Sequence, residues 1–222
     1  MPLMNFNKTV PFKRRYGISG YFQLLFHNFF DLVLLNILFI FTSLPIFTIG
    51  ASYLALQEMT LNMYLDKPTY FCKDYFACFK KNFKDGVIGG LIFLALLLMS
   101  GFAFFFYYDM AKTMPVLYVA SVISLICFVL FFMMSVYYFP QLCLVKLKVT
   151  QMLKNSLILC IAKLFRTLCA ALIGGLFIVL FALFFPYSIP FVVLGPVSLF
   201  SLACSVATYK PIKENVMADE EE

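Results

Sequence analysis

Residues 86–108 read GVIGGLIFLALLLMSGFAFFFYY, a run of 23 uncharged and mostly apolar residues. A helix needs about 20 such residues to cross the hydrocarbon core of a bilayer, which is ~30 Å thick. Helices suit this environment because their backbone polar groups are satisfied within the segment. The run therefore predicts a transmembrane helix and an integral membrane protein.

Three further charge-free runs, at 32–57, 113–145 and 167–209, flank this one. The last run is far too long for one helix, and Pro186 and Pro190 predict a turn between two spans. We therefore predict an all-α, polytopic transmembrane bundle of about six apolar helices. Their approximate ranges are 21–44, 46–65, 86–108, 115–145, 167–185 and 188–209. These helices form one transmembrane domain, 21–209, between a basic N-terminus, 1–20, and a tail, 210–222.

Composition indicates the same class of protein. The chain is 63% apolar and 13% charged, with a mean hydropathy of +0.94, whereas soluble domains are ~45–50% apolar and ~25% charged. A water-soluble domain of this size cannot hide so much apolar surface. The seven cysteines have no C-x-x-C spacing and His27 is the sole histidine, which excludes multi-histidine metal sites and most histidine-based catalysis. We therefore expect no catalytic residues, no metal, no cofactor and no enzymatic activity.

Lysine and arginine positions predict the orientation, because cytoplasmic loops are enriched in both residues. If the chain between 21 and 65 crosses and returns, 16 of the 17 basic residues fall on one side; a single crossing divides them 12 to five. The first arrangement is favoured, so a hairpin bends near Pro45 and both termini are cytoplasmic. Two full crossings are favoured over a deep re-entrant loop, and both fit the sequence. The net charge of +6 then indicates anionic lipid headgroups of the cell membrane as partners, rather than nucleic acid.

Two basic segments, 69–84 and 149–166, are predicted as amphipathic helices that lie in the headgroup plane. In the first, Phe76, Phe79 and Phe83 recur at helical spacing, which predicts the buried face. The basic residues expected to contact anionic lipids or a partner protein are Lys73, Lys80, Lys81, Lys84, Lys163 and Arg166.

An internal repeat is indicated by a shift of 85 residues, which places IGGL at 88–91 on IGGL at 173–176. Each copy reads as a basic amphipathic helix followed by a span, as in a parallel repeat of the kind known in transporters. Small residues four apart let helix backbones approach closely. Intramolecular packing is favoured over the seam of a homo-oligomer, which stays an alternative. The residues expected to pack helices are Pro45, Gly50, Ala51, Ser52, Gly86, Gly90, Ala171 and Gly175.

Ionisable residues at membrane depth are candidate functional residues, because placing them there is costly. Asp31 and Glu58 both lie about 18–20 Å below the bend, at 1.5 Å per residue. Gln57 lies beside them, and His27 lies one turn lower. A facing pair of carboxylates would suit proton or cation coupling. The favoured alternative places both at the cytoplasmic interface, within reach of headgroups or basic side chains.

The stretch 36–56, NILFIFTSLPIFTIGASYLAL, resembles the YesL family of bacterial integral membrane proteins. In that family an N-L-L-W-like start precedes S-L-P, T-I-G-A-S and an alanine-rich helix. The downstream segment 76–84, FACFKKNFK, is also similar to the family, whereas Phe39 stands where tryptophan is expected. Members are commonly encoded beside sugar ABC importers and polysaccharide-degrading enzymes. The resemblance therefore implies an accessory role in carbohydrate uptake and defines no catalytic residues.

We accordingly expect an interaction protein, a subunit or an assembly or regulatory factor of a sugar ABC importer. The sequence contains no G-x-x-x-x-G-K-[ST] motif, so an ATP-driven step would belong to the partner. The alternative is a small proton- or cation-coupled transporter or channel that uses Asp31 and Glu58. Asp31→Asn and Glu58→Gln would abolish a pH-dependent flux in the second case and change nothing in the first.

Overall fold

The regular structure is entirely helical in the residues that the computed structural model describes, which are 18–145, 147, 149–184 and 195–217. The predicted all-α class is therefore confirmed. The helices are α1 (Ile18–His27), α2 (Phe29–Thr42), α3 (Ile49–Tyr64), α4 (Phe71–Lys81), α5 (Phe83–Met110), α6 (Leu117–Leu144), α7 (Val149–Ala162), α8 (Leu164–Leu183) and α10 (Pro196–Ile212). Short turns of helix cover Ile46–Thr48 and Lys213–Met217. Most of the basic N-terminus, the predicted turn near Pro186 and the end of the tail lie outside the described residues.

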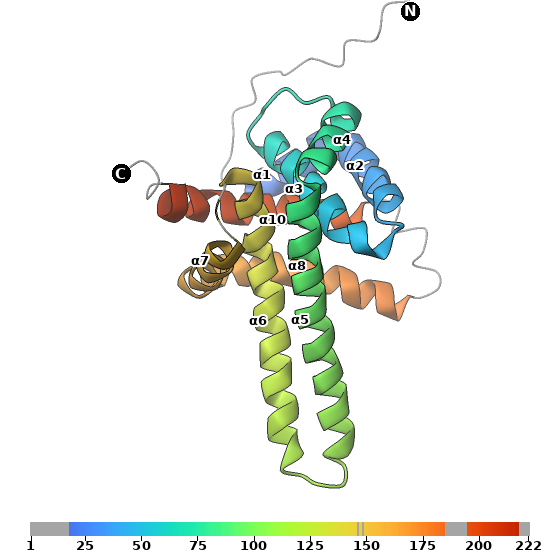
Figure 1. The fold of residues 1–222 in the computed structure, drawn as a ribbon. Coiled ribbons are helices and arrows are strands. Elements are labelled where there is room, and N and C mark those ends of the chain that lie inside the picture. The colour runs from blue at the N-terminus through green and yellow to red at the C-terminus, as the bar shows by residue number, and fades with distance from the viewer. Residues whose placement is uncertain (1–17, 146, 148, 185–194, 218–222) are drawn as a thin grey trace, which may run out of the picture.

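Helices α5 and α6 form a long antiparallel hairpin that extends from the rest of the molecule (Figure 1). Each helix is long and apolar enough to cross a membrane, and the rest of the chain buries only 17% of the apolar window of α5 and 22% of that of α6. Apolar side chains exposed along the hairpin include Leu98, Met99, Phe102, Phe105, Val122 and Ile126. The hairpin thus indicates a membrane protein and contains the predicted spans 86–108 and 115–145.

Two other apolar segments are sharply bent. The axes of α1 and α2 differ by 84° across Asn28, and those of α7 and α8 differ by 100° across Lys163. Each pair, with α8 taken as far as Leu176, is long and apolar enough to cross a membrane when its two parts count as one span. Where sequence predicts one helix over 21–44, the structure therefore has two. The described chain contains two clear spans, or up to four with the bent pairs, so six apolar spans are not confirmed.

Helix α3 is the centre of the remaining helices, which we call the head. Most of its residues are buried, and α2, α4, α5, α6 and α10 pack around it. Its side chains Leu56 and Met59 join Leu32 and Leu35 from α2 and Leu202 from α10 in one core cluster. A helix that is covered on all sides belongs to a protein core, so α3 is placed by its neighbours rather than by lipid.

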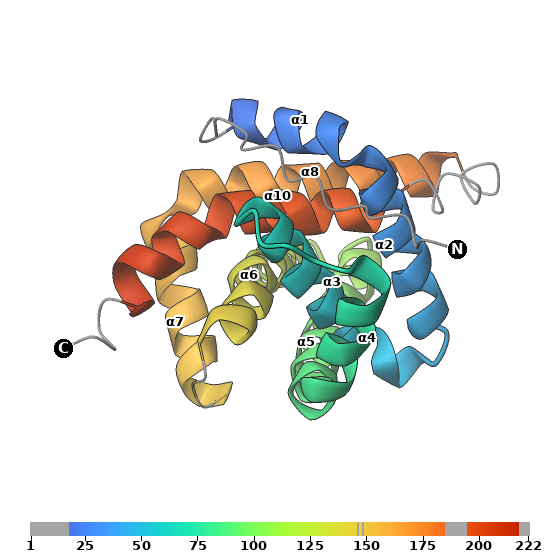
Figure 2. The same ribbon diagram turned by 90° about the horizontal axis from the view of Figure 1, so that it is seen from above.

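Helices α8 and α10 lie side by side and run crosswise to the hairpin (Figures 1 and 2). Helix α8 meets α6 where Ala170 lies in one cluster with Val136 and where Thr167 Oγ1 donates a hydrogen bond to Tyr137 Oη over 3.4 Å. A parallel repeat would make α5 and α8 equivalent spans. Their crosswise arrangement does not fit that prediction, because packing against α6 and α10 sets the direction of α8.

The glycines of the two IGGL copies also differ in their surroundings. Gly89 lies against the ring of Tyr138, and its counterpart Gly174 lies against the ring of Phe200. Gly90 lies against the backbone of α3, whereas a Cβ added at its counterpart Gly175 would meet no atom within 4 Å. The two IGGL segments therefore make similar contacts at Gly89 and Gly174 but different contacts at Gly90 and Gly175.

Candidate functional site

Helices α3 and α5 cross in direct backbone contact. A Cβ added at Gly50 would lie 2.2 Å from the carbonyl oxygen of Gly86 and 2.5 Å from Cα of Gly90. A Cβ added at Gly86 would lie 2.6 Å from Cα of Ala51. The structure thus brings four of the small residues from the sequence analysis into one intramolecular contact, which we call the glycine crossing. Ala171 lies instead in a separate cluster with Tyr137 and Leu159.

The bend between α2 and α3 is held by its own hydroxyl groups. Thr48 Oγ1 donates to the carbonyl oxygens of Thr42 at 2.7 Å and Pro45 at 2.6 Å, and Ser43 Oγ donates to Ile40 O at 3.1 Å. Ser52 Oγ donates to Thr48 O at 3.0 Å. Buried backbone oxygens need such partners where a helix is interrupted. These hydroxyl groups therefore satisfy backbone oxygens where the helix is interrupted near Pro45.

Tyr75 on α4 joins this bend from outside and was missed by the sequence analysis. Its side chain is fully buried, and its hydroxyl lies 2.7 Å from Thr42 Oγ1 and donates to Ser52 O at 3.3 Å. Burial raises the pKa of Tyr75 to about 12, so the phenol stays neutral. Phe71, Tyr75 and Phe79 recur four apart and pack into one cluster, which is the signal in the sequence that could have identified this face.

A buried polar seam joins α3 to α10. Gln57 Nε2 donates to Ser205 Oγ at 2.7 Å, and Ser201 Oγ donates to Gln57 Oε1 at 2.8 Å. Thr60 Oγ1 lies 2.8 Å from Ser201 Oγ and 3.1 Å from Ser205 Oγ. All four side chains are fully buried. Because both ends of the Gln57 amide have partners, the seam orients two helices and leaves no free polar group on Gln57 to line a path.

The two carboxylates singled out from the sequence have different partners. Asp31 is half-buried in the first turn of α2, near His27 at the end of α1. Glu58 is half-buried on α3 and accepts a hydrogen bond from Asn82 Nδ2 at 2.9 Å. The structure gives no contact between the two carboxylates.

The basic residues predicted to contact lipids or a partner surround the junctions of α4 with α5 and of α7 with α8. All are exposed except Lys163, which is half-buried. Within the described residues none of them forms an ion pair. The inner face of α4 differs from the prediction, because Tyr75 is buried whereas Phe76 is 42% exposed. Helix α4 thus packs on the head and still presents lysines outward.

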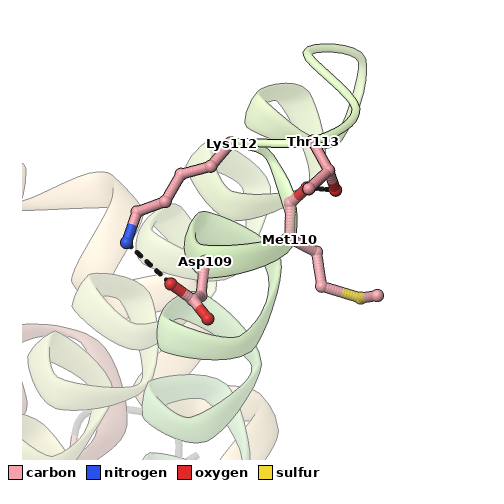
Figure 3. Close-up of polar contacts among 4 residues, drawn as sticks. All are labelled: Asp109, Met110, Lys112 and Thr113. Carbon is pink, nitrogen blue, oxygen red and sulfur yellow. Dashed lines mark hydrogen bonds and ion pairs between the residues drawn. The ribbon is translucent and has the colours of Figure 1, made fainter.

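The tip of the hairpin is polar (Figure 3). Lys112 Nζ donates to Asp109 Oδ1 at 2.7 Å, and Thr113 Oγ1 donates to Met110 O at 2.8 Å. The carboxylate of Asp109 raises the pKa of Lys112 above its ordinary value. The turn at the end of the hairpin therefore carries an ion pair beside the exposed apolar side chains of Met114 and Val116.

These features define an all-helical protein with an apolar hairpin long enough to span a membrane. Residues 32–109 match the model of a family described as protein of unknown function, DUF624, which includes the YesL-type proteins. The matched segment runs from α2 through α5 and contains the bend, Tyr75 and the glycine crossing. No curated protein matches the chain, and no solved structure does.

Proposed function

We propose that the protein is a bacterial integral membrane protein of the YesL type that assists carbohydrate uptake by binding a sugar ABC importer. The α5–α6 hairpin would cross the cell membrane, with its tip outside and both chain termini in the cytoplasm. In this role the protein is a subunit or an assembly factor, and transport itself belongs to the importer.

The length of the hairpin supports the crossing. The part of α6 from Leu117 at the tip to Val136, where α8 packs, is about 28 Å long at 1.5 Å per residue. That length equals the hydrocarbon core of a bilayer, ~30 Å. The lysines of α4 and the start of α5 then lie beyond the core on the head side, where anionic headgroups of the cytoplasmic leaflet attract them.

The single observation that carries the proposal is the bare outer half of the hairpin. Phe105 is 70% exposed, and apolar neighbours on both helices, among them Phe102 and Val119, are exposed as well. Packing between helices in lipid depends on close contact and on hydrogen bonds. A hairpin that its own chain covers so little offers two helix faces to the helices of a partner.

The polar groups favour a binding role over ion coupling. Both ends of the Gln57 side-chain amide are hydrogen-bonded to α10. Glu58 accepts a hydrogen bond from Asn82, and Asp31 lies near His27. A coupled transporter needs ionisable groups that line a shared path. The arrangement of these three residues therefore gives the transporter hypothesis no support.

Site-specific photocrosslinking tests the proposal. A photoreactive phenylalanine analogue at Phe105 should, in native membranes, form adducts with importer membrane subunits that mass spectrometry identifies. The matched control is the same analogue at Phe93, which is 3% exposed between α3 and α6, and it should crosslink within the chain. If Phe105 yields lipid adducts alone while the importer is expressed, the proposed partnership is refuted.

A further inference from the structure

A cleft of ≈ 320 Å³ opens between α3, the loop that follows it, and α4. Its walls are two polar stripes at helical spacing: Glu58 and Asn62 on α3, and Asp74, Cys78 and Lys81 on α4. Lys67 and Thr69 from the loop and Met59 from α3 also line the cleft. Small-molecule sites typically enclose about 300–1,000 Å³, so the cleft has room for a small ligand.

The charges around the cleft are balanced but not paired with one another. Two acidic and two basic side chains line it, Glu58 and Asp74 against Lys67 and Lys81. Glu58 is oriented by Asn82, and Asp74 Oδ2 accepts a hydrogen bond from the backbone N–H of Tyr70 at 2.7 Å. In the part of the chain that the structure describes, neither lysine side chain has an ion-pair partner. The cleft therefore holds fixed acidic groups and uncommitted ammonium groups at once.

The thiol in the cleft does not supply reactive or metal-binding chemistry. Burial and the neighbouring Glu58 carboxylate raise the pKa of Cys78 to about 12. The thiolate is the form of cysteine that acts as a nucleophile or binds a metal, so the neutral thiol of Cys78 does neither. The described residues also contain no group of three or more His, Cys, Asp or Glu side chains that could hold a metal ion.

Charge complementarity favours a ligand that carries both signs of charge. A simple anion would be attracted by the two lysines and repelled by the two carboxylates. A simple cation would be attracted by the carboxylates and repelled by the lysines. A small zwitterion avoids both conflicts, because its phosphate can bind Lys67 and Lys81 while its ammonium binds Glu58 and Asp74. Hydrogen bonds between charged groups are about twice as strong as neutral ones, so a ligand that uses both signs gains most.

We propose that the α3–α4 cleft binds a phosphoethanolamine group. Two sources carry this chemistry: free phosphoethanolamine and the headgroup of phosphatidylethanolamine. The site is independent of an importer partner and would exist in the isolated protein. This binding also differs from general attraction to anionic lipid. In phosphatidylethanolamine the charge of the one phosphate is balanced by that of the one ammonium.

Binding to the full-length protein in mild detergent tests the site. Calorimetry with free phosphoethanolamine should show saturable binding that is at least tenfold tighter than binding of inorganic phosphate or ethanolamine. Dihexanoyl phosphatidylethanolamine distinguishes the sources: binding tighter than that of phosphoethanolamine identifies the lipid headgroup, and weaker binding identifies the free compound. Either result supports the shared chemistry.

Two variants with matched controls assign the residues. Lys81→Met should weaken phosphoethanolamine binding about tenfold, whereas Lys84→Met, an equal change of charge outside the cleft, should not. Glu58→Gln should remove the preference for phosphoethanolamine over inorganic phosphate, and Asp85→Asn should keep it. Absence of phosphoethanolamine binding, or binding that is unchanged in both cleft variants, overturns the proposal.

Discussion

Replacing Gly50 by alanine should separate α3 from α5, because the new methyl group has no space. Its Cβ would lie 2.2 Å from Gly86 O and 2.5 Å from Gly90 Cα, whereas non-bonded carbon contacts are favourable at about 3.5–4.0 Å. Both obstructing atoms belong to the backbone and cannot rotate away, so the helices must move apart by about 1 Å or more. Overpacking of this kind costs about 1–3 kcal/mol, and we expect a loss of about 2–3 kcal/mol in the free energy of unfolding.

Gly175→Ala is the matched control, because a Cβ there would meet no atom within 4 Å. Alanine is favoured over glycine inside a helix by roughly 0.5–1 kcal/mol, so this variant should be slightly more stable than the wild type. Unfolding of both variants in mixed micelles, titrated with a denaturing detergent and followed by circular dichroism, gives the two free energies. Equal stability of the two variants would refute the glycine crossing.

Two further changes test the polar contacts of the head by the same unfolding assay. Tyr75→Phe should lower the free energy of unfolding by about 1 kcal/mol, because it removes a hydroxyl that bonds to α2 and α3. Tyr138→Phe should lower it by less than about 0.5 kcal/mol, because the buried Tyr138 hydroxyl has no hydrogen-bond partner in the described part of the chain. A larger loss for Tyr138 than for Tyr75 would contradict this assignment. Gln57→Leu should cost about 1–3 kcal/mol, because Ser201 and Ser205 lose their amide partner; an unchanged stability would show that the seam does not hold α10 to α3.

The hairpin was predictable because its signal is local. A charge-free run of membrane-spanning length specifies a helix whatever its neighbours are. The predicted range 86–108 lies within α5, which begins three residues earlier at Phe83 and so includes Lys84 and Asp85. The range 115–145 matches α6 to within two residues at each end. The interruption near Pro45 was equally visible, because proline disrupts a helix through its own ring.

The bend at Asn28 was not predictable from local signals, because Asn28 is neither proline nor glycine and lies inside the predicted helix 21–44. The bend at Lys163 falls three residues before the predicted boundary between the basic segment 149–166 and the span 167–185. Asn28 has φ −113° and ψ 29°, outside the helical range. Contacts of α1 with α10 and of α8 with α6 and α10 accompany the change of direction, and such tertiary contacts have no periodic signature in the sequence.

The buried polar contacts between α3 and α10 were likewise only partly predictable from the sequence. The sequence analysis identified Gln57 because it stands in an apolar segment, but not its partners Ser201 and Ser205, which lie more than 140 residues away. Serines at positions four apart in an apolar helix are a weak signal, since they can also bond to their own backbone. The facing of Asp31 and Glu58 was inferred from their equal depth below the bend near Pro45, but equal depth does not specify the partner of a side chain, and Glu58 bonds instead to Asn82 at the start of α5.

Accessibility of the hairpin tip tests the central claim most directly. In a Cys72→Ser, Cys78→Ser background, Met114→Cys places one exposed thiol in the tip, and the wild-type Cys72 provides an exposed thiol on α4 of the head. With a membrane-impermeant maleimide on intact cells, the tip thiol should react at once, and Cys72 of the wild type should react only after permeabilisation. Labelling of Cys72 in intact cells, or protection of the tip until permeabilisation, would contradict a hairpin that crosses the membrane from a cytoplasmic head.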